Sequence, residues 1–280
     1  MKIAIIGASG FLGKKLFDYF SKKYEVIGVD RNPISDLITK IDAINKKAMA
    51  KFLLEQKPEV VINTVALTSS VACERDSELC KKLNYETAKN IKESCKKIGA
   101  KMIFISSSFI FDGERGNYSE EDELNPTNQY AKTKIMAEKI ISELEDYLII
   151  RVDMMYGVDN KKIKFGTGTF ERETIGVGYP NQTKQPVFID DVPRVIDFLI
   201  QKNQKGIFHV AGPDKINILD FLRKLAKLEN AGDKIKIVDS SKWLVKSPLN
   251  STLNISKIVS LGIKTTSFED ALNKIKKQIS

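Results

Sequence analysis

The sequence predicts an α/β fold with a doubly wound parallel sheet, and three features of its 280 residues indicate this class. Short apolar runs alternate with amphipathic segments over the first 157 residues. A glycine-rich turn joins the first apolar run to the first amphipathic segment. The chain is 42% hydrophobic and 29% charged, which is enough apolar sequence to bury a core. Strands that alternate with helices form a parallel sheet covered on both faces.

The expected strands are Lys2 to Ile6, Glu25 to Asp30, Glu59 to Val65, Lys101 to Ser107 and Tyr147 to Val152. The expected helices between them are Phe11 to Lys22, Lys46 to Gln56, Glu74 to Ile98 and Gln129 to Leu144. Beyond Gly157 we expect a helix at Asp191 to Gln201, a strand at Gly206 to Val210 and a helix near Ile218 to Leu228. Residues 1–157 should form the main domain, with strand returns from the C-terminal half, and residues 158–280 a smaller substrate-binding lobe.

Composition argues against several classes of partner. No run approaches the roughly 20 apolar residues of a membrane span, and no leader pattern follows Met1. We therefore expect a cytoplasmic protein that does not contact membranes. The net charge of +9 comes from lysines spread along helix faces instead of one patch, so no nucleic-acid partner is expected. A homodimer stays open.

The few cysteines and the single histidine limit the chemistry. Cys73, Cys80 and Cys95 lack metal-ligand spacing, and we interpret them as free thiols. His209 has no second histidine with which to share a zinc ion. No metal site is expected. A hydrolase is disfavoured as well, because no Gly-x-Ser-x-Gly nucleophile elbow accompanies His209.

The turn Gly7-Ala-Ser-Gly-Phe-Leu-Gly13 follows a strand and opens a helix, which is the context of a dinucleotide-binding fingerprint. One glycine permits the tight turn, a second lets the backbone approach a pyrophosphate, and a third lets the helix pack closely on the strand. The helix N-terminus then faces the phosphates. We therefore expect a Rossmann-type site whose cofactor contacts include Gly7, Ser9, Gly10, Phe11, Leu12 and Gly13.

Two adjacent charged residues bear on which dinucleotide binds. Asp30 ends the second strand, where an acid commonly receives the adenosine ribose hydroxyls. Arg31 follows at once and could hold the 2′-phosphate of NADP. These residues favour opposite cofactors, and we predict that NADPH is preferred while NAD is also accepted. Ala66 follows the strand that begins at Glu59 and is expected to lie under the dinucleotide.

A tyrosine and a lysine one helical turn apart are candidates for proton transfer. Tyr130 and Lys134 open the helix that comes after the strand ending at Ser107. Two other pairs have the same spacing, Tyr19 with Lys23 and Tyr85 with Lys89. Only Tyr130 follows a strand that ends in hydroxyl side chains, so position and not spacing singles it out.

Together these motifs resemble the extended, nucleotide-sugar-modifying branch of the short-chain dehydrogenase/reductase superfamily, which the Gly-x-x-Gly-x-x-Gly spacing also fits. Further landmarks, in order from Met1 to about Leu272, resemble the dTDP-4-dehydrorhamnose reductase family. They are Val61-Ile-Asn-Thr-Val-Ala66, Cys73-Glu74, Leu83-Asn84, the run from Ile105 to Gly113, Asn125-Pro126, Ala137-Glu138, Arg151, Tyr156-Gly157, Pro186, Asp190-Asp191 and the segment from Pro248 to Lys257.

The resemblance implies roles for four side chains. Tyr130 would protonate the ketone oxygen, and Lys134 would favour the phenolate and bond the nicotinamide ribose hydroxyls. Ser107 would hold the substrate oxygen, in place of the family's threonine, and Asp42 would contact the adenine. Because a nearby ammonium favours a phenolate, we expect the pKa of Tyr130 to lie below the usual value of about 10.

On the substrate side the chain departs from that family. Ser108 and Phe109 replace an acidic and a phenolic sugar contact, and Met154 replaces a tryptophan on which a sugar could stack. Ser247 stands where the family has an arginine before its proline. These changes affect the substrate contacts and not the expected cofactor contacts.

The resemblance thus implies an NADPH-dependent oxidoreductase that reduces a nucleotide-linked 4-ketosugar, similar to dTDP-4-dehydrorhamnose reductase of dTDP-rhamnose biosynthesis. An alternative is a cofactor-binding regulatory subunit similar to the methionine adenosyltransferase beta subunit. An NAD-dependent nucleotide-sugar epimerase or dehydratase comes third, because Ser108 and Phe109 lack the acid and base pair of dehydratases.

Overall fold

The structure is a computed structural model of the chain, and it describes residues 1–171, 174–239 and 244–280. The chain divides into two compact units whose segments alternate along the sequence. Unit 1 consists of Met1–Ser107, Gln129–Arg151 and Val192–Phe208, and unit 2 of Ser108–Asn128, Val152–Asp191 and His209–Ser280. The boundary expected after Gly157 falls inside strand β7 (Met155–Asp159), which belongs to unit 2.

A seven-stranded sheet with the order β13-β6-β5-β4-β1-β2-β3 forms the centre of unit 1. Its strands are β1 (Lys2–Ile6), β2 (Glu25–Asp30), β3 (Ile38–Lys40), β4 (Val60–Asn63), β5 (Lys101–Ser107), β6 (Tyr147–Val152) and β13 (Gly206–Val210). Strand β1 pairs in parallel with both β2 and β4, so the strand order reverses direction there. This confirms the doubly wound parallel sheet, whose ligand site lies at the carboxyl ends of the strands beside that reversal.

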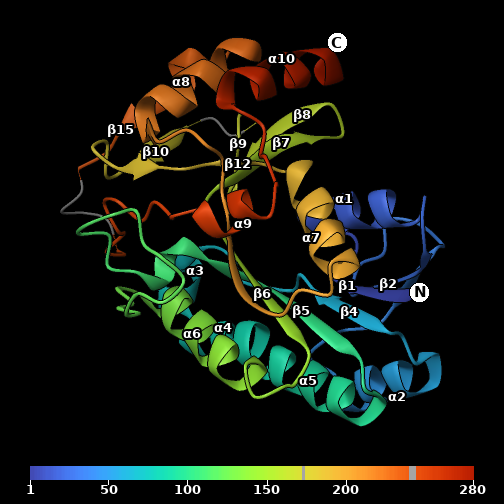
Figure 1. The fold of residues 1–280 in the computed structure, drawn as a ribbon. Helices are drawn as coiled ribbons and strands as arrows, with labels where there is room; N and C mark the ends of the chain where they lie inside the picture. The colour runs from blue at the N-terminus through green and yellow to red at the C-terminus, as the bar shows by residue number, and fades with distance from the viewer. Residues whose placement is uncertain (172–173, 240–243) are drawn as a thin grey trace. The chain divides into compact units, whose positions relative to one another are not determined.

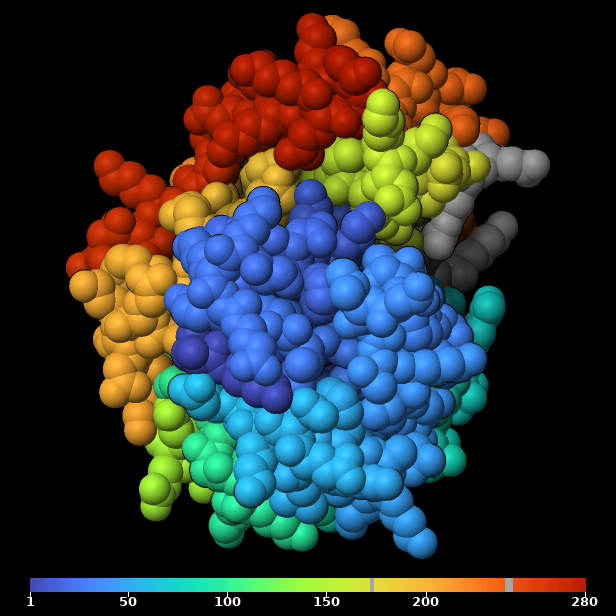
Figure 2. All heavy atoms as spheres, turned by 90° about the vertical axis from the view of Figure 1, so that its right-hand side faces the viewer, coloured from blue at the N-terminus to red at the C-terminus, as the bar shows by residue number. Residues whose placement is uncertain are grey.

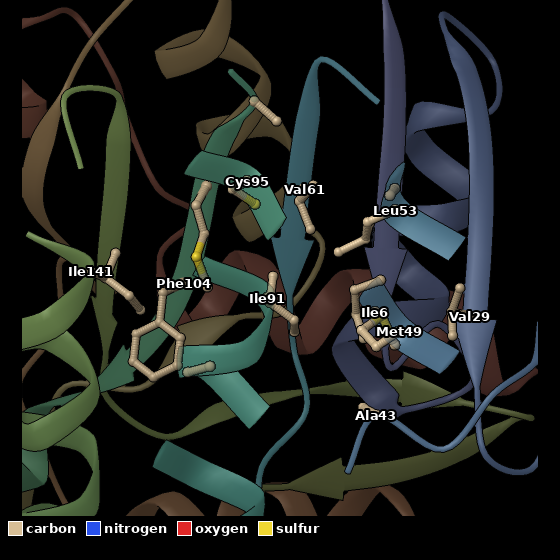
Figure 3. Packing of buried hydrophobic residues seen from close by; sticks show 14 of the residues in the cluster. Ile6, Val29, Ala43, Met49, Leu53, Val61, Ile91, Cys95, Phe104 and Ile141 are labelled. Carbon is tan, nitrogen blue, oxygen red and sulfur yellow. The ribbon is translucent and has the colours of Figure 1, made fainter. Parts of the chain in front are cut away.

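Helices cover both faces of this sheet (Figure 1). Helices α1 (Phe11–Phe20) and α7 (Asp191–Gln201) lie on one face, and α2 (Lys46–Gln56), α5 (Thr87–Ile98) and α6 (Gln129–Ile141) on the other. Apolar side chains of the sheet, among them Ile6, Val61 and Phe104, pack against Leu53 of α2 and Ile91 of α5 (Figure 3). Burial on both faces explains why the strands read as continuous apolar runs.

The prediction of a single helix from Glu74 to Ile98 is wrong. The structure has α3 (Ser70–Arg75), α4 (Ser77–Lys81), a π-helical turn at Lys82–Glu86 and then α5. Asp76 causes the first break, because its φ of −137° is not helical. Its backbone N–H donates to the Ala72 carbonyl, which is the last hydrogen bond of α3. Its carboxylate caps α4 by accepting a hydrogen bond from Leu79 N.

Unit 2 contains small sheets around a separate apolar core. Its four-stranded sheet consists of β12 (Val187–Phe188), β7, β8 (Lys162–Phe165) and β9 (Gly168–Thr169). Two pairs join β10 (Ile175–Val177) to β15 (Ile235–Ile237) and β11 (Thr183–Lys184) to β14 (Ile216–Asn217). Its helices include α8 (Ile218–Leu228), α9 (Ser256–Ser260) and α10 (Phe268–Ile279). Within the described ranges, no helix combines the length and apolar character needed to cross a membrane.

Candidate active site

Two glycines of the first turn are required by its geometry. Gly7 has a φ of +89°, and a Cβ there would lie 2.6 Å from Thr64 Oγ1. A Cβ on Gly13 would lie 1.9 Å from the Gly7 carbonyl oxygen, because α1 starts directly against the turn. Gly7 N also donates to the Val29 carbonyl at 2.8 Å, which ties the turn to β2. Any side chain at Gly7 or Gly13 would therefore separate α1 from the sheet.

Gly10 occupies a different environment. It is exposed at the N-cap of α1, and a Cβ there would meet only the Gly7 oxygen, at 3.3 Å. No side chain caps the helix, so its first turn is open to an anion. Leu12 is buried, and we infer that it could reach a phosphate only through its backbone N–H. This arrangement fits the pyrophosphate of a dinucleotide.

Asp30 holds the glycine turn against the loop that follows β2. Its carboxylate accepts from Ser9 N at 3.0 Å and from Asn32 N at 2.9 Å. Ser9 Oγ accepts in turn from Ile34 N at 3.3 Å. Arg31 is exposed, and within the described ranges no hydrogen bond or ion pair engages its guanidinium. Its segment belongs to the N-terminal part of unit 1, in blue in Figure 2. Arg31 is therefore available to a phosphate.

The structure places Asp42 and Ala66 in two other loops of unit 1. The Asp42 carboxylate accepts from Ile44 N at 3.0 Å, which gives this residue a local role in the turn before α2. Thr64 Oγ1 donates to the Ile6 and Gly7 carbonyls, so the segment after β4 lies beside the glycine turn. Ala66, two residues further on, is partly exposed at the same end of the sheet.

Ser107, Tyr130 and Lys134 are brought together within unit 1. Ser107 is the last residue of β5, and Tyr130 and Lys134 lie on the first turns of α6. A side-chain hydrogen bond joins Ser107 to Tyr130. Lys134 Nζ donates to the Ile105 carbonyl at 2.9 Å and lies 5.9 Å from the centre of the Tyr130 ring. These three side chains therefore lie close together at the carboxyl end of β5, and their catalytic roles stay predictions.

The electrostatics of this group differ from the expectation. Burial raises the pKa of the Tyr130 hydroxyl, and the hydrogen bond to Ser107 offsets only part of that shift. Burial also lowers the pKa of Lys134 to about 7, although the nearby Glu138 carboxylate opposes this change. The expected lowering of the Tyr130 pKa is therefore wrong for this structure. The physical reason for the difference is that burial removes water, which disfavours the phenolate form of Tyr130 and the ammonium form of Lys134.

Two buried polar contacts hold α6 in place. Arg151 on β6 contacts Glu138 on α6 with Nε–O distances of 3.1 and 3.2 Å, and its Nη2 lies 2.8 Å from Glu138 Oε2. Both side chains are almost completely buried. On another side of the helix, Asn84 Nδ2 donates to Thr133 Oγ1 at 3.1 Å and Asn84 Oδ1 accepts from Leu67 N at 2.7 Å. Asn84 thus links the segment after β4 to α6.

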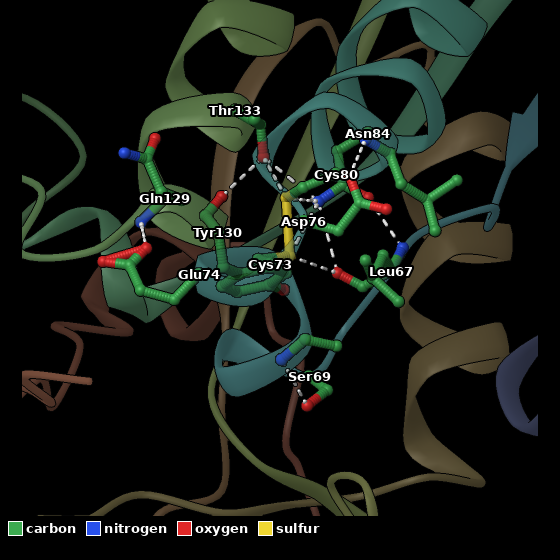
Figure 4. The surroundings of a disulfide bond; sticks show 12 residues. Leu67, Ser69, Cys73, Glu74, Asp76, Cys80, Asn84, Gln129, Tyr130 and Thr133 are labelled. Carbon is green, nitrogen blue, oxygen red and sulfur yellow. Dashed lines mark hydrogen bonds between the residues drawn. A yellow bond between two sulfur atoms is a disulfide. The ribbon is translucent and has the colours of Figure 1, made fainter. Parts of the chain in front are cut away.

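The interpretation of all three cysteines as free thiols is wrong for two of them. Cys73 on α3 and Cys80 on α4 form a disulfide, and only Cys95 is free among the described cysteines (Figure 4). The break at Asp76 brings the two short helices together, with a Cα–Cα distance of 4.9 Å between the cysteines. A continuous helix would have placed residues seven apart about 10 Å from each other along its axis. The acidic cap at Asp76 was the sequence signal for this break.

Two of the four positions at which the chain departs from the reductase pattern, Ser108 and Phe109, lie at a polar cluster of unit 2. Ser108 Oγ donates to Asp153 Oδ1 at 3.0 Å, and Gln185 N donates to Asp153 Oδ2 at 2.6 Å. Lys184 is buried, with Nζ 4.6 Å from the centre of the Phe109 ring. Burial lowers the Lys184 pKa, while Asp153 opposes that shift. A buried amine and carboxylate therefore accompany Ser108 and Phe109. Met154 packs against the unit 2 core, and Ser247 is partly exposed.

His209 belongs to the interior of unit 2. Its side chain is fully buried, its ring packs edge-on to Phe111 at 5.9 Å, and its backbone N–H donates to Glu120. Within the part of the chain that the structure describes, no three side chains of His, Cys, Asp or Glu gather closely enough to hold a metal ion.

Comparisons with known proteins match one family profile and find several similar proteins and structures. The family profile described as "RmlD substrate binding domain" matches residues 1–280. The methionine adenosyltransferase 2 subunit beta of Bos taurus is 26% identical over 94% of this chain and 83% of its own length. A crystal structure described as a hypothetical dTDP-4-dehydrorhamnose reductase of Sulfolobus tokodaii has a TM-score of 0.82 and 29% identity, covering 95% of this chain and 96% of that one. The dTDP-4-dehydrorhamnose reductase of Bacillus anthracis, solved with NADP, has a TM-score of 0.84 at 24% identity, with 98% of each chain covered.

Proposed function

The chain belongs to the RmlD substrate-binding-domain family, and on that premise we propose that it is an NADPH-dependent reductase of a nucleotide-linked 4-ketosugar. The proposed substrate is dTDP-4-dehydrorhamnose or a close variant, and the proposed product carries a hydroxyl group at C4. The observation that carries the proposal is the joining of Ser107, Tyr130 and Lys134 at the carboxyl end of β5. NAD is the proposed second cofactor.

When bound, NADPH supplies the hydride that adds to the ketone carbon. The side chains of this protein manage the proton and the orientation of the substrate. Tyr130 gives its hydroxyl proton to the ketone oxygen as that oxygen gains charge, and Ser107 donates a hydrogen bond to the same oxygen. The high pKa of Tyr130 keeps this hydroxyl protonated before the reaction. Lys134, held on the Ile105 carbonyl, lies within reach to stabilise the phenolate that remains.

Cofactor binding is proposed for the glycine turn and for α1. Gly10 and the first turn of α1 would hold the pyrophosphate, and Lys134 would also contact the nicotinamide ribose. Arg31 would pair with the 2′-phosphate, because the Asp30 carboxylate is already engaged by Ser9 N and Asn32 N. This engagement favours NADPH over NAD.

The test is turnover followed at the NADPH absorbance band, with a panel of dTDP-, UDP- and GDP-linked 4-ketosugars. Wild-type protein should oxidise NADPH with at least one of them. Tyr130→Phe should abolish turnover and leave the Kd for NADPH within about twofold, since only the proton donor is removed. Lys132→Met, on the same helix and next to neither Tyr130 nor Lys134, is the matched control and should retain the wild-type kcat.

A second candidate function is favoured by the likeness to the methionine adenosyltransferase 2 subunit beta. In that case the protein would bind the dinucleotide and change the rate of a partner enzyme. Inactivity on the whole panel, together with copurification of an enzyme whose rate the protein alters, would replace the reductase proposal with this one. The cytoplasmic location and the homodimer stay predictions.

A further inference from the structure

Cys73 and Cys80 lie against the helix that carries Tyr130 and Lys134 (Figure 4). We propose that these two cysteines are a reversible redox pair that fixes the first turn of α6 and thereby positions Tyr130. Tyr130 is the group that acts on the substrate in the proposed function, so Cys73 and Cys80 are positioning residues. The proposal that the disulfide fixes the first turn of α6 does not depend on which reaction the protein catalyses. Only the expected change in kcat rests on the proposed function.

Each cysteine is connected to the start of α6 by a short path. Cys80 Sγ lies 3.5 Å from Thr133 Oγ1, and Thr133 Oγ1 donates to the Tyr130 carbonyl at 2.8 Å. Glu74, the residue after Cys73, accepts a hydrogen bond from Gln129 N at 3.2 Å. This carboxylate satisfies the first backbone N–H of α6, where the helix dipole also favours a negative charge. The disulfide therefore connects two contacts that hold the same helical turn.

The surroundings offer hydrogen-bond partners to both oxidation states. The Leu67 carbonyl lies 3.3 Å from Cys73 Sγ and can accept a proton from the reduced thiol. In the disulfide that oxygen still has a donor, because Asn84 Nδ2 lies 3.2 Å away. Cys80 Sγ lies 3.4 Å from the same Asn84 Nδ2 and can accept its hydrogen in the reduced state, when the Cys73 thiol donates to the Leu67 carbonyl instead. Reduction therefore leaves no buried polar group of this set without a partner, as a reversible pair requires.

Exchange of the disulfide requires a small-molecule disulfide as oxidant and a dithiol as reductant. In oxidation, the thiolate of one cysteine attacks the small disulfide and releases one thiolate. The second cysteine then loses its proton, attacks the mixed disulfide and releases the other. The protein loses two electrons and two protons, and the small disulfide becomes two thiols. Because Cys73 and Cys80 are fully buried, attack requires local opening of α3 or α4. These helices have six and five residues, so this opening involves few hydrogen bonds.

Cys95 provides a matched control. It is free, fully buried on α5 in the same unit, and burial raises its pKa to about 12. It should therefore remain a thiol under conditions that oxidise Cys73 and Cys80. Cys95→Ser changes a buried sulfur without changing the disulfide.

The experiment uses the full-length protein after incubation with oxidised glutathione or with dithiothreitol. Alkylation of the unfolded protein, read by mass spectrometry, should find one free thiol in the oxidised sample and three in the reduced one. Hydrogen exchange of the peptide 129–141 should be about tenfold faster in the reduced protein, while exchange in α1 should be unchanged. Cys73→Ser and Cys80→Ser should exchange like reduced wild type whatever the redox treatment. Cys95→Ser should still respond to it.

Kinetics with the ketosugar provide the functional readout. Reduction should lower kcat about threefold and change the KM for NADPH by less than twofold, because the proton donor is less well placed while the glycine turn and α1 keep their contacts with the cofactor. Three thiols in every sample, or equal exchange of peptide 129–141 in both states, would overturn the proposal. An exchange difference in a protein that turns over no ketosugar would instead retain the redox pair and reject the reductase function.

Discussion

Replacing Gly10 with valine should weaken cofactor binding while leaving the fold intact. A Cβ at Gly10 meets only the Gly7 oxygen, at 3.3 Å, and the φ of −70° suits any residue. The valine side chain would project from the open first turn of α1, where the proposed pyrophosphate approaches the backbone. Loss of one hydrogen bond to a charged group costs about 1.5–3 kcal/mol, which raises Kd about 10- to 160-fold. The N-cap change itself should lower the free energy of unfolding by no more than about 1 kcal/mol.

Gly13→Ala is the control, and we expect it to destabilise the fold, whereas Gly10→Val should mainly weaken cofactor binding. Its Cβ would lie 1.9 Å from the Gly7 carbonyl oxygen and 2.8 Å from the Gly7 carbonyl carbon, so backbone must move. Overpacking of this kind costs about 1–3 kcal/mol, and the unfolding temperature should fall by several degrees. Fluorescence titration with NADPH and thermal unfolding of both variants provide the two measurements. Wild-type affinity in Gly10→Val, or wild-type stability in Gly13→Ala, would refute the assignment of the two glycines.

Three further predictions concern other residues of unit 1. Arg31→Ala should raise the Kd for NADPH about tenfold or more and leave that for NADH within about twofold; equal weakening in titrations with both cofactors would mean that Asp30 governs recognition. Glu138→Gln leaves the Arg151 charge buried without its carboxylate, and urea unfolding should show a loss of about 3–5 kcal/mol, whereas a loss below 1 kcal/mol would contradict the buried pair. Burial lowers the pKa of Lys134 from 10.5 to about 7 in the folded protein. Between pH 7 and 10.5 the unfolded chain therefore binds a proton at Lys134 that the folded protein has lost. The free energy of unfolding should rise with pH over this range. Lys134→Met should reduce that slope by up to about 1.4 kcal/mol per pH unit in urea titrations at pH 7.5 and 9.5, and an unchanged slope would show that Lys134 titrates normally.

The Tyr-x-x-x-Lys spacing alone does not distinguish Tyr130 from Tyr19. Tyr19 and Lys23 also form a pair in the structure, with Lys23 Nζ 2.9 Å from the Tyr19 oxygen. That pair lies beside Asp197, which holds the same ammonium at 2.7 Å, and not beside a strand-end serine. Chain order distinguished the two, because the chain leaves β5 at the carboxyl edge of the sheet and α6 is the α-helix that follows. The pKa of Tyr130 could not be obtained in that way, since it depends on how deeply the folded chain buries the hydroxyl.

The sequence by itself determined the parallel sheet, its main helices and the placement of Gly7, Gly13, Ser107 and Tyr130. These features depend on periodicity and on turns of a few residues, which are local properties of the chain. Only the tertiary structure decided that the expected helix from Glu74 breaks, that Cys73 meets Cys80, and that Asn84 reaches Thr133. These contacts join α3, α4 and the π-helical turn to one another and to α6. Their energy exists only after distant segments have packed together, so no local pattern along the chain could specify them.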